Sequence, residues 1–224
     1  MNYLIGGSSR CGKSTLARAL RHRTGAHGLS GDALRDTLRK TTAPGTIPEL
    51  NQPRAEKIVD EREFVEYHTL RAGDEIDKKR QQAAVVWPFL HNYLVTINRE
   101  SSDVAVAESI DIWPDLIATS GLAHRAVFLV DTAPGQWERI VATRGVDTKD
   151  WMHANGYSDE RIQAWSAFNA QRSQVVKSLC DEYAYPCVDL AETGFAEAQR
   201  LALDMLQTQP LHGHQQNYFN ECSA

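Results

Sequence analysis

Eight residues near the N-terminus combine the glycines and side chains that bind a phosphate chain. Gly7 to Ser14 reads Gly-Ser-Ser-Arg-Cys-Gly-Lys-Ser and fits the pattern G-x-x-x-x-G-K-S/T. Glycine admits backbone angles that a Cβ atom forbids, so successive N–H groups in such a loop can point at one anion. The Lys13 ammonium would then reach the terminal phosphates, and the Ser14 hydroxyl would be a ligand of Mg²⁺. We therefore expect the nucleotide contacts to come from Gly7, Ser8, Ser9, Arg10, Cys11, Gly12, Lys13, Ser14 and Thr15.

The sequence on either side of this loop supplies the elements that a phosphate cradle requires. Residues 2–6 form a short apolar run typical of a buried strand, and residues 13–23 place Leu16, Ala19 and Leu20 on one face of a helix. A helix that begins at the loop adds unpaired N–H donors and the positive end of its dipole. The alternative is a glycine-rich turn between a strand and a helix that binds no ligand.

A second candidate group follows the next predicted strand, residues 27–30. Asp32 precedes a predicted helix over residues 33–40, and Arg35 lies one turn further on. The carboxyl ends of parallel strands face the ligand crevice of an α/β sheet, so Asp32 would lie beside the cradle. There its carboxylate could orient an acceptor hydroxyl and take the hydroxyl proton, while Arg35 could hold an anionic acceptor. Alternatively Asp32 only caps the helix, and the two roles are compatible.

The rest of the sequence alternates predicted strands and helices, which indicates an α/β fold with a parallel sheet flanked by helices. Strands are expected at 103–108, 126–130 and 186–190, and helices at 136–144, 158–183 and 194–207.

The stretch between the second and third predicted strands is long and mostly helical. A loop over 41–53 precedes a helical stretch over 54–98, which we expect to break at Gly73 and at Trp87-Pro88. We therefore predict a helical covering insertion at about 41–100. The whole domain is expected over 1–207, followed by a poorly ordered tail over 208–224.

Composition and charge exclude several classes of protein. The formal net charge of −5 argues against a general nucleic-acid binder, and no run of about 18 apolar residues predicts a membrane span. No signal-peptide pattern is present, and the four scattered cysteines (Cys11, Cys180, Cys187 and Cys222) lack metal-ligand spacing. We expect a cytoplasmic protein with reduced thiols. Cys11 lies inside the cradle, where the pKa of its thiol could be lowered, and the alternative is that its side chain only fills the loop.

Three segments together resemble a known family. IGGSSRCGKSTLA (residues 5–17) followed by LSGDALR (residues 29–35) resembles the P-loop kinases of small molecules, within the nucleoside-monophosphate-kinase-like superfamily that includes 2-phosphoglycerate-kinase-like and zeta-toxin-like branches. Residues 105–114 (AVAESIDIWP) are similar to a segment of the first branch in which a strand ends in Glu-Gly before an apolar stretch and a proline. Here Ser109 replaces that glycine.

The resemblance implies a P-loop NTPase core that uses ATP and Mg²⁺ and transfers the γ-phosphate to a small-molecule hydroxyl or phosphate, with Asp32 as the base. It implies that Glu108 lies near Mg²⁺ or its water, because Mg²⁺ keeps much of its hydration. The alternative for Glu108 is a carboxylate at a strand end, paired with an arginine. Backbone near residues 189–193 would contact the base.

The resemblance also implies an arginine-bearing lid, which the sequence places at about 136–157. A planar guanidinium suits this task because it spreads charge over several phosphate oxygens. We expect Arg144 to act in catalysis and Arg139 to contact substrate, with Arg161 and Arg172 as candidates further along the chain.

Two other functions stay open at this point. A polynucleotide-end kinase would need a basic channel, which a chain of net charge −5 without Lys/Arg clusters does not predict. A non-catalytic ATP-binding switch would bind the nucleotide and transfer nothing. The guanine-reading stretch Asn-Lys-x-Asp of GTPase switches is absent from the sequence. The identity of the acceptor would be set by residues 41–100, which carry no recognisable motif.

Overall fold

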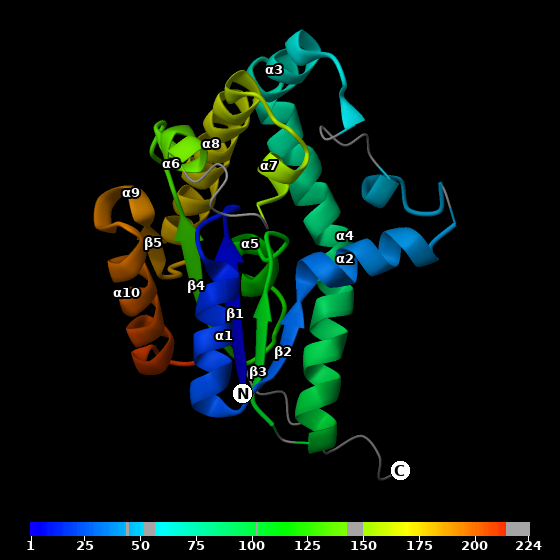
Figure 1. Cartoon of the computed structure of the whole chain (residues 1–224). Helices are drawn as coiled ribbons and strands as arrows, with labels where there is room; N and C mark the ends of the chain where they lie inside the picture. The colour runs from blue at the N-terminus through cyan, green and yellow to red at the C-terminus, as the bar shows by residue number, and fades with distance from the viewer. Residues whose placement is uncertain (44, 52–56, 102, 143–149, 214–224) are drawn as a thin grey trace.

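The computed structural model describes residues 1–43, 45–51, 57–101, 103–142 and 150–213. The strands are β1 (Asn2–Gly7), β2 (His27–Ser30), β3 (Ala105–Glu108), β4 (His124–Val130) and β5 (Cys187–Asp189). The helices are α1 (Lys13–Thr24), α2 (Gly31–Thr41), the short 3₁₀ helix η1 (Pro48–Asn51), α3 (Glu61–Thr69), α4 (Ala72–Ser101), α5 (Pro114–Ala118), α6 (Gln136–Ala142), α7 (Trp151–Ala154), α8 (Asp159–Glu182), α9 (Leu190–Thr193) and α10 (Phe195–Thr208) (Figure 1). None of the helices in these ranges is long and apolar enough to cross a membrane.

The strands of the described residues form one parallel sheet in the order β2-β3-β1-β4-β5. The predicted parallel sheet flanked by helices is therefore confirmed. β1 is central, and the register places both Ile5 of β1 and Ser30 of β2 opposite Glu108 of β3. The loops that leave these three strands consequently start at one edge of the sheet, which is where the candidate site lies.

Alternation along the strands divides the core between the two faces of the sheet. Leu4 and Phe128 pack on one face with apolar residues of α4, α5 and α8. Tyr3, Ile5 and Leu129 pack on the other face with α1 and α10. Both faces are covered, which explains why the strands consist of nearly continuous apolar runs.

The helical stretch is interrupted directly before Gly73, where α3 ends at Thr69 and α4 begins at Ala72, so the break predicted there is confirmed. The break predicted at Trp87-Pro88 is wrong, because α4 runs for 30 residues and continues through Pro88. Proline removes one helical hydrogen bond, but Pro88 and Ala84, whose carbonyl loses that partner, are both exposed to water. The adjacent Leu90 is fully buried against the sheet, and this packing holds the helix together across the proline.

The segment predicted as a covering insertion therefore has two parts. The C-terminal half of α4 belongs to the sheet core, since Leu90 and Leu94 pack with β-strand residues. The N-terminal end of α4 and the separate helix α3 lie beyond the carboxyl edge of the sheet. Figure 1 shows α3, α6, α7 and α8 gathered at that end, where Phe64, Tyr157 and Trp165 join a third apolar cluster.

The end of the described chain returns to the sheet. Of the tail predicted over 208–224, the structure describes residues up to 213. There His212 forms a backbone bridge with His124, with the His212 N–H donating to the His124 carbonyl at 2.8 Å and the reverse bond at 2.9 Å. The His124 imidazole is buried, with Nδ1 2.6 Å from the Leu122 carbonyl oxygen and Nε2 3.0 Å from the Tyr185 hydroxyl.

We expect His124 to make stability depend on pH in the mildly acidic range. Burial lowers the pKa of His124 from 6.5 to about 4, so the unfolded chain binds more protons than the folded chain between these values. Stability is therefore lost as the pH falls through this window, by up to about 3 kcal/mol. Urea unfolding at several pH values should show a shallower loss for His124→Gln than for the wild type. Equal slopes would remove His124 as the cause.

Candidate active site

The phosphate loop, Gly7 to Ser14, is shaped by close approach to the neighbouring strand. Gly7 has φ 114°, and a Cβ atom there would lie 2.0 Å from the Leu129 carbonyl oxygen. The next residue, Ser8, donates its N–H to that same oxygen at 2.8 Å. Gly12 caps α1 in the left-handed region without a side-chain hydrogen bond, so the first N–H groups of α1 face the loop free of a side-chain cap. This geometry is that of an anion cradle.

Lys13 lies under the phosphate loop. Lys13 is only 6 % exposed, and its Nζ donates to the Ser8 carbonyl oxygen at 2.6 Å. Burial lowers the pKa of Lys13, with the nearby Asp32 and Glu108 acting in the opposite direction. The ammonium is thus held inside the cradle, where an anion would stabilise its charge.

Ser14 and Glu108 meet beside the loop, as predicted for a Mg²⁺ site. The Ser14 hydroxyl donates to Glu108 Oε2 at 3.2 Å. Both groups offer hard oxygen atoms, and a Mg²⁺ site commonly uses one or two protein ligands together with phosphate oxygens and water. The donor set therefore fits Mg²⁺.

Asp32 does not cap helix α2, so the capping alternative is wrong. The cap is Ser30, whose side chain accepts from the Ala33 N–H at 3.4 Å. Asp32 instead accepts hydrogen bonds from Ser109 Oγ at 3.1 Å and Arg35 Nη1 at 3.2 Å, and its side chain is 43 % exposed. Its carboxylate is thus oriented by neighbours while one side stays open to a ligand.

A buried carboxylate stands behind Asp32. Asp111 accepts from Arg35 Nη1 at 2.7 Å and lies 3.2 Å from Ser109 Oγ. Burial raises the pKa of Asp111, and the Arg35 charge opposes that rise. Burial tends to lower the pKa of Arg35, but Asp111 and Asp32 together raise it. Arg35 is therefore a fixed cation between two carboxylates.

Ser109, which departs from the family pattern, orients Asp32 and Asp111 from the end of β3. Its hydroxyl also accepts the Asp111 N–H at 2.9 Å. The close approach requires glycine at the start of α2, because a Cβ on Gly31 would lie 2.5 Å from the Ser109 Cβ. The replacement of glycine by Ser109 is visible in the sequence, but this role is not, because the pairing of Ser109 with Asp32 joins segments 77 residues apart.

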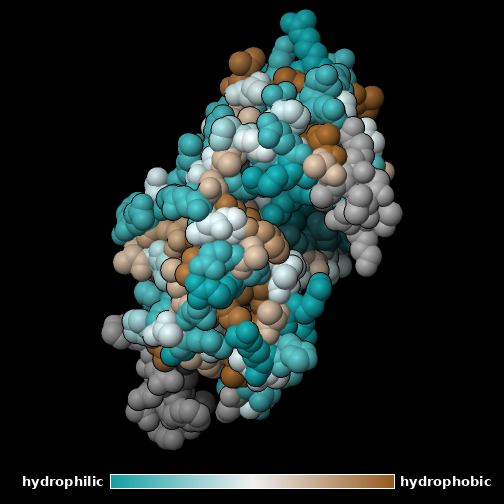
Figure 2. All heavy atoms as spheres, turned by 60° about the vertical axis from the view of Figure 1, so that its left-hand side comes forward, coloured by the Kyte–Doolittle hydropathy of each residue, from teal (hydrophilic) through white to brown (hydrophobic). Residues whose placement is uncertain are grey.

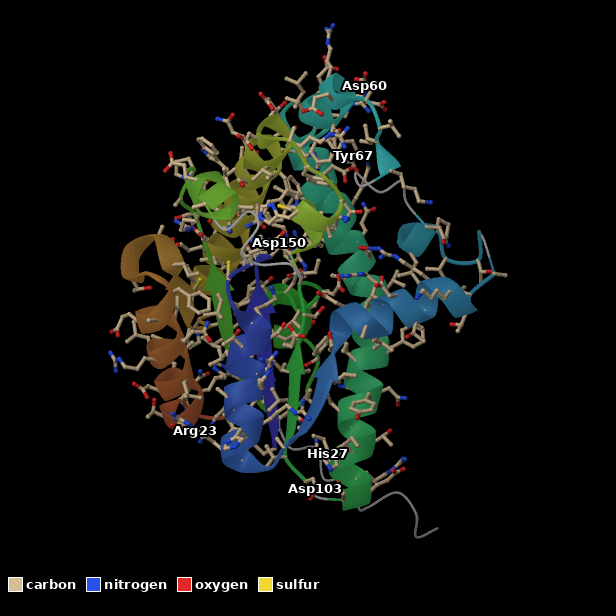
Figure 3. The ribbon with its side chains drawn as sticks, viewed as in Figure 1. Arg23, His27, Asp60, Tyr67, Asp103 and Asp150 are labelled. Carbon is tan, nitrogen blue, oxygen red and sulfur yellow. The ribbon has the colours of Figure 1, made fainter. Side chains whose placement is uncertain are left out.

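A cavity of about 420 Å³ opens from this group of side chains. It is bounded by the phosphate loop, α2, α3, α4, α7 and α8, and Figure 2 shows hydrophilic residues lining a hollow at mid-height. In Figure 3, Tyr67 lies on the inner side of α3 and Asp150 lies close to the end of β1. The charged residues in the cavity wall are Asp32, Arg35, Asp36, Arg39, Glu75, Lys79 and Arg172, and the aromatic ones include Phe64, Tyr157 and Trp165.

The arginines that the sequence offered for the lid lie in different parts of the structure. Arg139 pairs with Asp131, is 57 % exposed, and is absent from the described cavity wall. Arg144 falls outside the described residues. Arg161 lies over the Phe64 ring at 4.7 Å and pairs with Glu61 at 2.9 Å.

Arg172 is the arginine that the structure brings to the centre of the site. It is 3 % exposed and donates through Nη2 to the Ile110 carbonyl oxygen at 2.7 Å. Its buried Nε has no hydrogen-bond partner among the described residues. Asn169, one turn before Arg172 on the same helix, donates to the Ser9 carbonyl at 3.2 Å, and Ser173, the next residue after Arg172, donates to the Ser8 hydroxyl at 2.7 Å. Arg172 therefore lies between the phosphate loop and the cavity.

The phosphate loop is also tied to the C-terminal part of the expected lid. Arg10 has φ 63°, uncommon for a residue with a Cβ, and its guanidinium forms an ion pair with the buried Asp150. Asp150 in turn caps α7 by accepting the Met152 and His153 N–H groups. The Arg10 side chain is thus an ion-pair partner of α7 in addition to its place in the loop.

Comparison with solved structures assigns the fold. A crystal structure of a *Chloroflexus aurantiacus* protein provisionally described as a kinase matches at 15 % identity with a TM-score of 0.51, over 93 % of this chain and 98 % of that one. Two further structures match with lower TM-scores: Acinetobacter baumannii shikimate kinase with shikimate (17 % identity, TM-score 0.46, 92 % of this chain and 90 % of that one) and Campylobacter jejuni dephospho-CoA kinase (12 %, 0.39, 92 % and 95 %). No protein-family profile and no curated sequence matches. The chain therefore shares the fold of that Chloroflexus protein, with a five-stranded parallel sheet flanked by helices.

The pKa of the Cys11 thiol is shifted in the direction opposite to the one considered from the sequence. Its thiol is fully buried, and burial raises its pKa to about 12, against the lowering effect of Lys13. The lowered pKa is therefore wrong, because the side chain packs into the core under α1 instead of facing the cradle.

We expect Cys11 to resist alkylation in the folded protein. Iodoacetamide at about pH 8 reacts with thiolates, so it should label the half-buried Cys187 well before Cys11. Peptide mass spectrometry after timed quenching measures both sites, and labelling in urea serves as the control for intrinsic reactivity. A Cys11 rate equal to that of Cys187 in the folded chain would contradict the buried placement.

Proposed function

We propose that this protein is a phosphotransferase that moves the γ-phosphoryl group of ATP to a hydroxyl of a small-molecule acceptor. The observation that carries the proposal is one shared cavity, whose wall contains the phosphate loop at Ser9, the open carboxylate of Asp32 and the buried cation Arg172. A nucleotide in the loop would direct its terminal phosphate towards this cavity, and an acceptor in the cavity would meet Asp32.

The nucleotide end of the site uses groups that the loop already holds together. The loop N–H groups and the start of α1 would bind the β- and γ-phosphates, and Lys13 would exchange its hydrogen bond with Ser8 for a phosphate oxygen. Ser14 and Glu108 would hold Mg²⁺, which supplies positive charge beside the phosphates when bound. Phe195, an exposed ring beside Gly12, is available to contact the base.

The acceptor end supplies orientation and a proton acceptor. The acceptor hydroxyl would donate to the open side of Asp32, whose other contacts with Ser109 and Arg35 fix the carboxylate. As the new oxygen–phosphorus bond forms, the bond between the γ-phosphorus and the bridging oxygen breaks, and ADP leaves with that electron pair. The hydroxyl proton passes to Asp32.

Arg172 would stabilise charge on the transferred phosphoryl group. It lies beside the loop, and its guanidinium is held by the Ile110 carbonyl and by the Trp113 ring at 5.2 Å from the ring centre. A cation fixed before the reaction needs little reorganisation during transfer, which is the condition for efficient electrostatic stabilisation.

Removing the Lys13 ammonium should weaken nucleotide binding. A charge-assisted hydrogen bond to phosphate contributes about 1.5–3 kcal/mol, so Lys13→Ala should raise the Kd for a labelled ATP analogue by roughly ten- to a hundredfold. Lys13→Met keeps most of the apolar stem and should weaken binding similarly, which separates charge from packing. Melting temperatures report whether each variant is folded. Unchanged affinity in folded variants would overturn the nucleotide site.

Neutralising Asp32 should impair transfer and spare nucleotide binding. Loss of the base and orienting group predicts a fall in transfer of about a hundredfold for Asp32→Asn, measured as ATP turnover stimulated by a panel of alcohols. The matched control is Asp36→Asn, one turn further along α2 in the same cavity wall, which should retain most of the activity. Tight ATP binding without transfer to any alcohol in the wild type would instead support a non-catalytic switch.

A further inference from the structure

Each charged side chain in the described cavity wall has an ion-pair partner, except for two cations. Arg35 pairs with Asp32 and Asp111, and the side chains of Arg39 and Asp36 are joined at 3.1 Å. The remaining cations in the wall are Arg172 and Lys79, and no ion pair to a carboxylate of the described residues is formed by either.

The carboxylate on the same face of α4 as Lys79 is already engaged. Glu75 lies one turn before Lys79 and forms an ion pair at 2.6 Å with Lys78, which is outside the cavity wall. The Tyr67 hydroxyl also hydrogen-bonds to Glu75. The single negative charge of Glu75 is therefore shared with Lys78, and Lys79 has no hydrogen bond to it.

Lys79 also lies in a positive field. Burial lowers the pKa of its ammonium, Glu75 opposes that effect, and the three guanidinium groups of Arg35, Arg39 and Arg172 lower it further. Cations that converge on one cavity repel each other, and an anion in that cavity would relieve the repulsion.

The two unpaired cations lie on different helices of the cavity wall, Arg172 on α8 and Lys79 on α4. Arg172 lies beside the phosphate loop, because Asn169 and Ser173 of α8 contact Ser9 and Ser8. A nucleotide phosphate would neutralise it. Lys79 belongs to α4, with Gln82 of the same helix also in the cavity wall, and needs a second source of negative charge.

We propose that Lys79 binds an anionic group of the acceptor, a carboxylate or a phosphate, so that the acceptor is an alcohol carrying its own negative charge. This inference rests on the proposed function for the identity of the ligand as acceptor, while the anion site itself is a property of the cavity. The aromatic side chains of Phe64, Tyr157 and Trp165 in the same cavity give an apolar body of the acceptor a surface to pack against.

The test uses probes that share one body and differ in charge. These are para-(hydroxymethyl)benzoate, para-(hydroxymethyl)phenyl phosphate and the neutral para-(hydroxymethyl)benzamide. Their binding to the full chain, saturated with Mg²⁺ and a non-hydrolysable ATP analogue, is measured by calorimetry. At least one anion should bind the wild type about tenfold more tightly than the amide, and the arm that does so distinguishes carboxylate from phosphate.

Three variants separate charge recognition from packing. Lys79→Met should remove the preference for the anion and leave amide binding unchanged, and Lys79→Arg should retain the preference. Lys40→Met removes the charge of an exposed lysine on α2 outside the cavity wall and should leave all three affinities as in the wild type. Equal loss of anion and amide binding in Lys79→Met, or loss of the preference in Lys40→Met, would overturn the proposal, as would the absence of any preference in the wild type.

A second arm keeps this result separate from the nucleotide site. The same titrations without nucleotide use the Lys13→Met background, in which anion binding by the phosphate loop is weakened. A preference for anions that still depends on Lys79 supports the anion site even if the ATP analogue fails to bind the wild type, in which case only the proposed function falls. If Lys13→Met alone removes the preference for anions over the amide, and Lys79→Met does not change that preference, the anions bind at the phosphate loop and the inference is overturned.

Discussion

The parallel register of β1, β3 and β2 is the constraint on which the site depends. Because Ile5 and Ser30 both lie opposite Glu108, three chain segments leave the sheet at one level. This alignment puts Ser14 within hydrogen-bond distance of Glu108 and Ser109 within reach of Asp32. A shift by one residue in either pairing would turn the strand faces over and separate these groups.

The same edge of the sheet concentrates charge that is expensive to bury. Three charged groups are almost completely shielded from water: Lys13, Asp111 and Arg172. Burial lowers the pKa of Lys13 and Arg172 and raises that of Asp111, which in each case favours the neutral form. Such groups persist in a fold when fixed partners compensate them, as Arg35 does for Asp111. Where compensation within the chain is incomplete, as at the Arg172 Nε, the fold holds a cation ready for a ligand.

Much of this arrangement could be predicted from sequence where the signal is local. The strand–loop–helix around Gly7 to Ser14, the place of Asp32 after β2 and the start of α8 at Ser158, which accepts the Arg161 N–H, all depend on neighbours within a few residues. The continuity of α4 could not be predicted, because the packing of Leu90 on the sheet outweighs a helix-breaking proline.

The short helices α5, α7 and α9 also escaped prediction, since each is held by tertiary contacts and a few caps more than by periodicity. Arg172 was one candidate among several arginines in the sequence. Its position became clear only from long-range contacts, because Ser173 meets Ser8 across 165 residues of chain. The electrostatic environment of Cys11 was likewise invisible, since the direction in which a thiol points decides whether it meets amides or the apolar core.

Helix α4 has a mechanical consequence. At 1.5 Å per residue its 30 residues extend for about 45 Å, as a rod that carries Lys79 in its first half and is anchored beneath the sheet by Leu94. That wall of the cavity therefore moves with the sheet as one body. Helix α8 packs on the same face of the sheet and fixes a second wall, so any narrowing of the cavity around a ligand falls to the short helices α3 and α7.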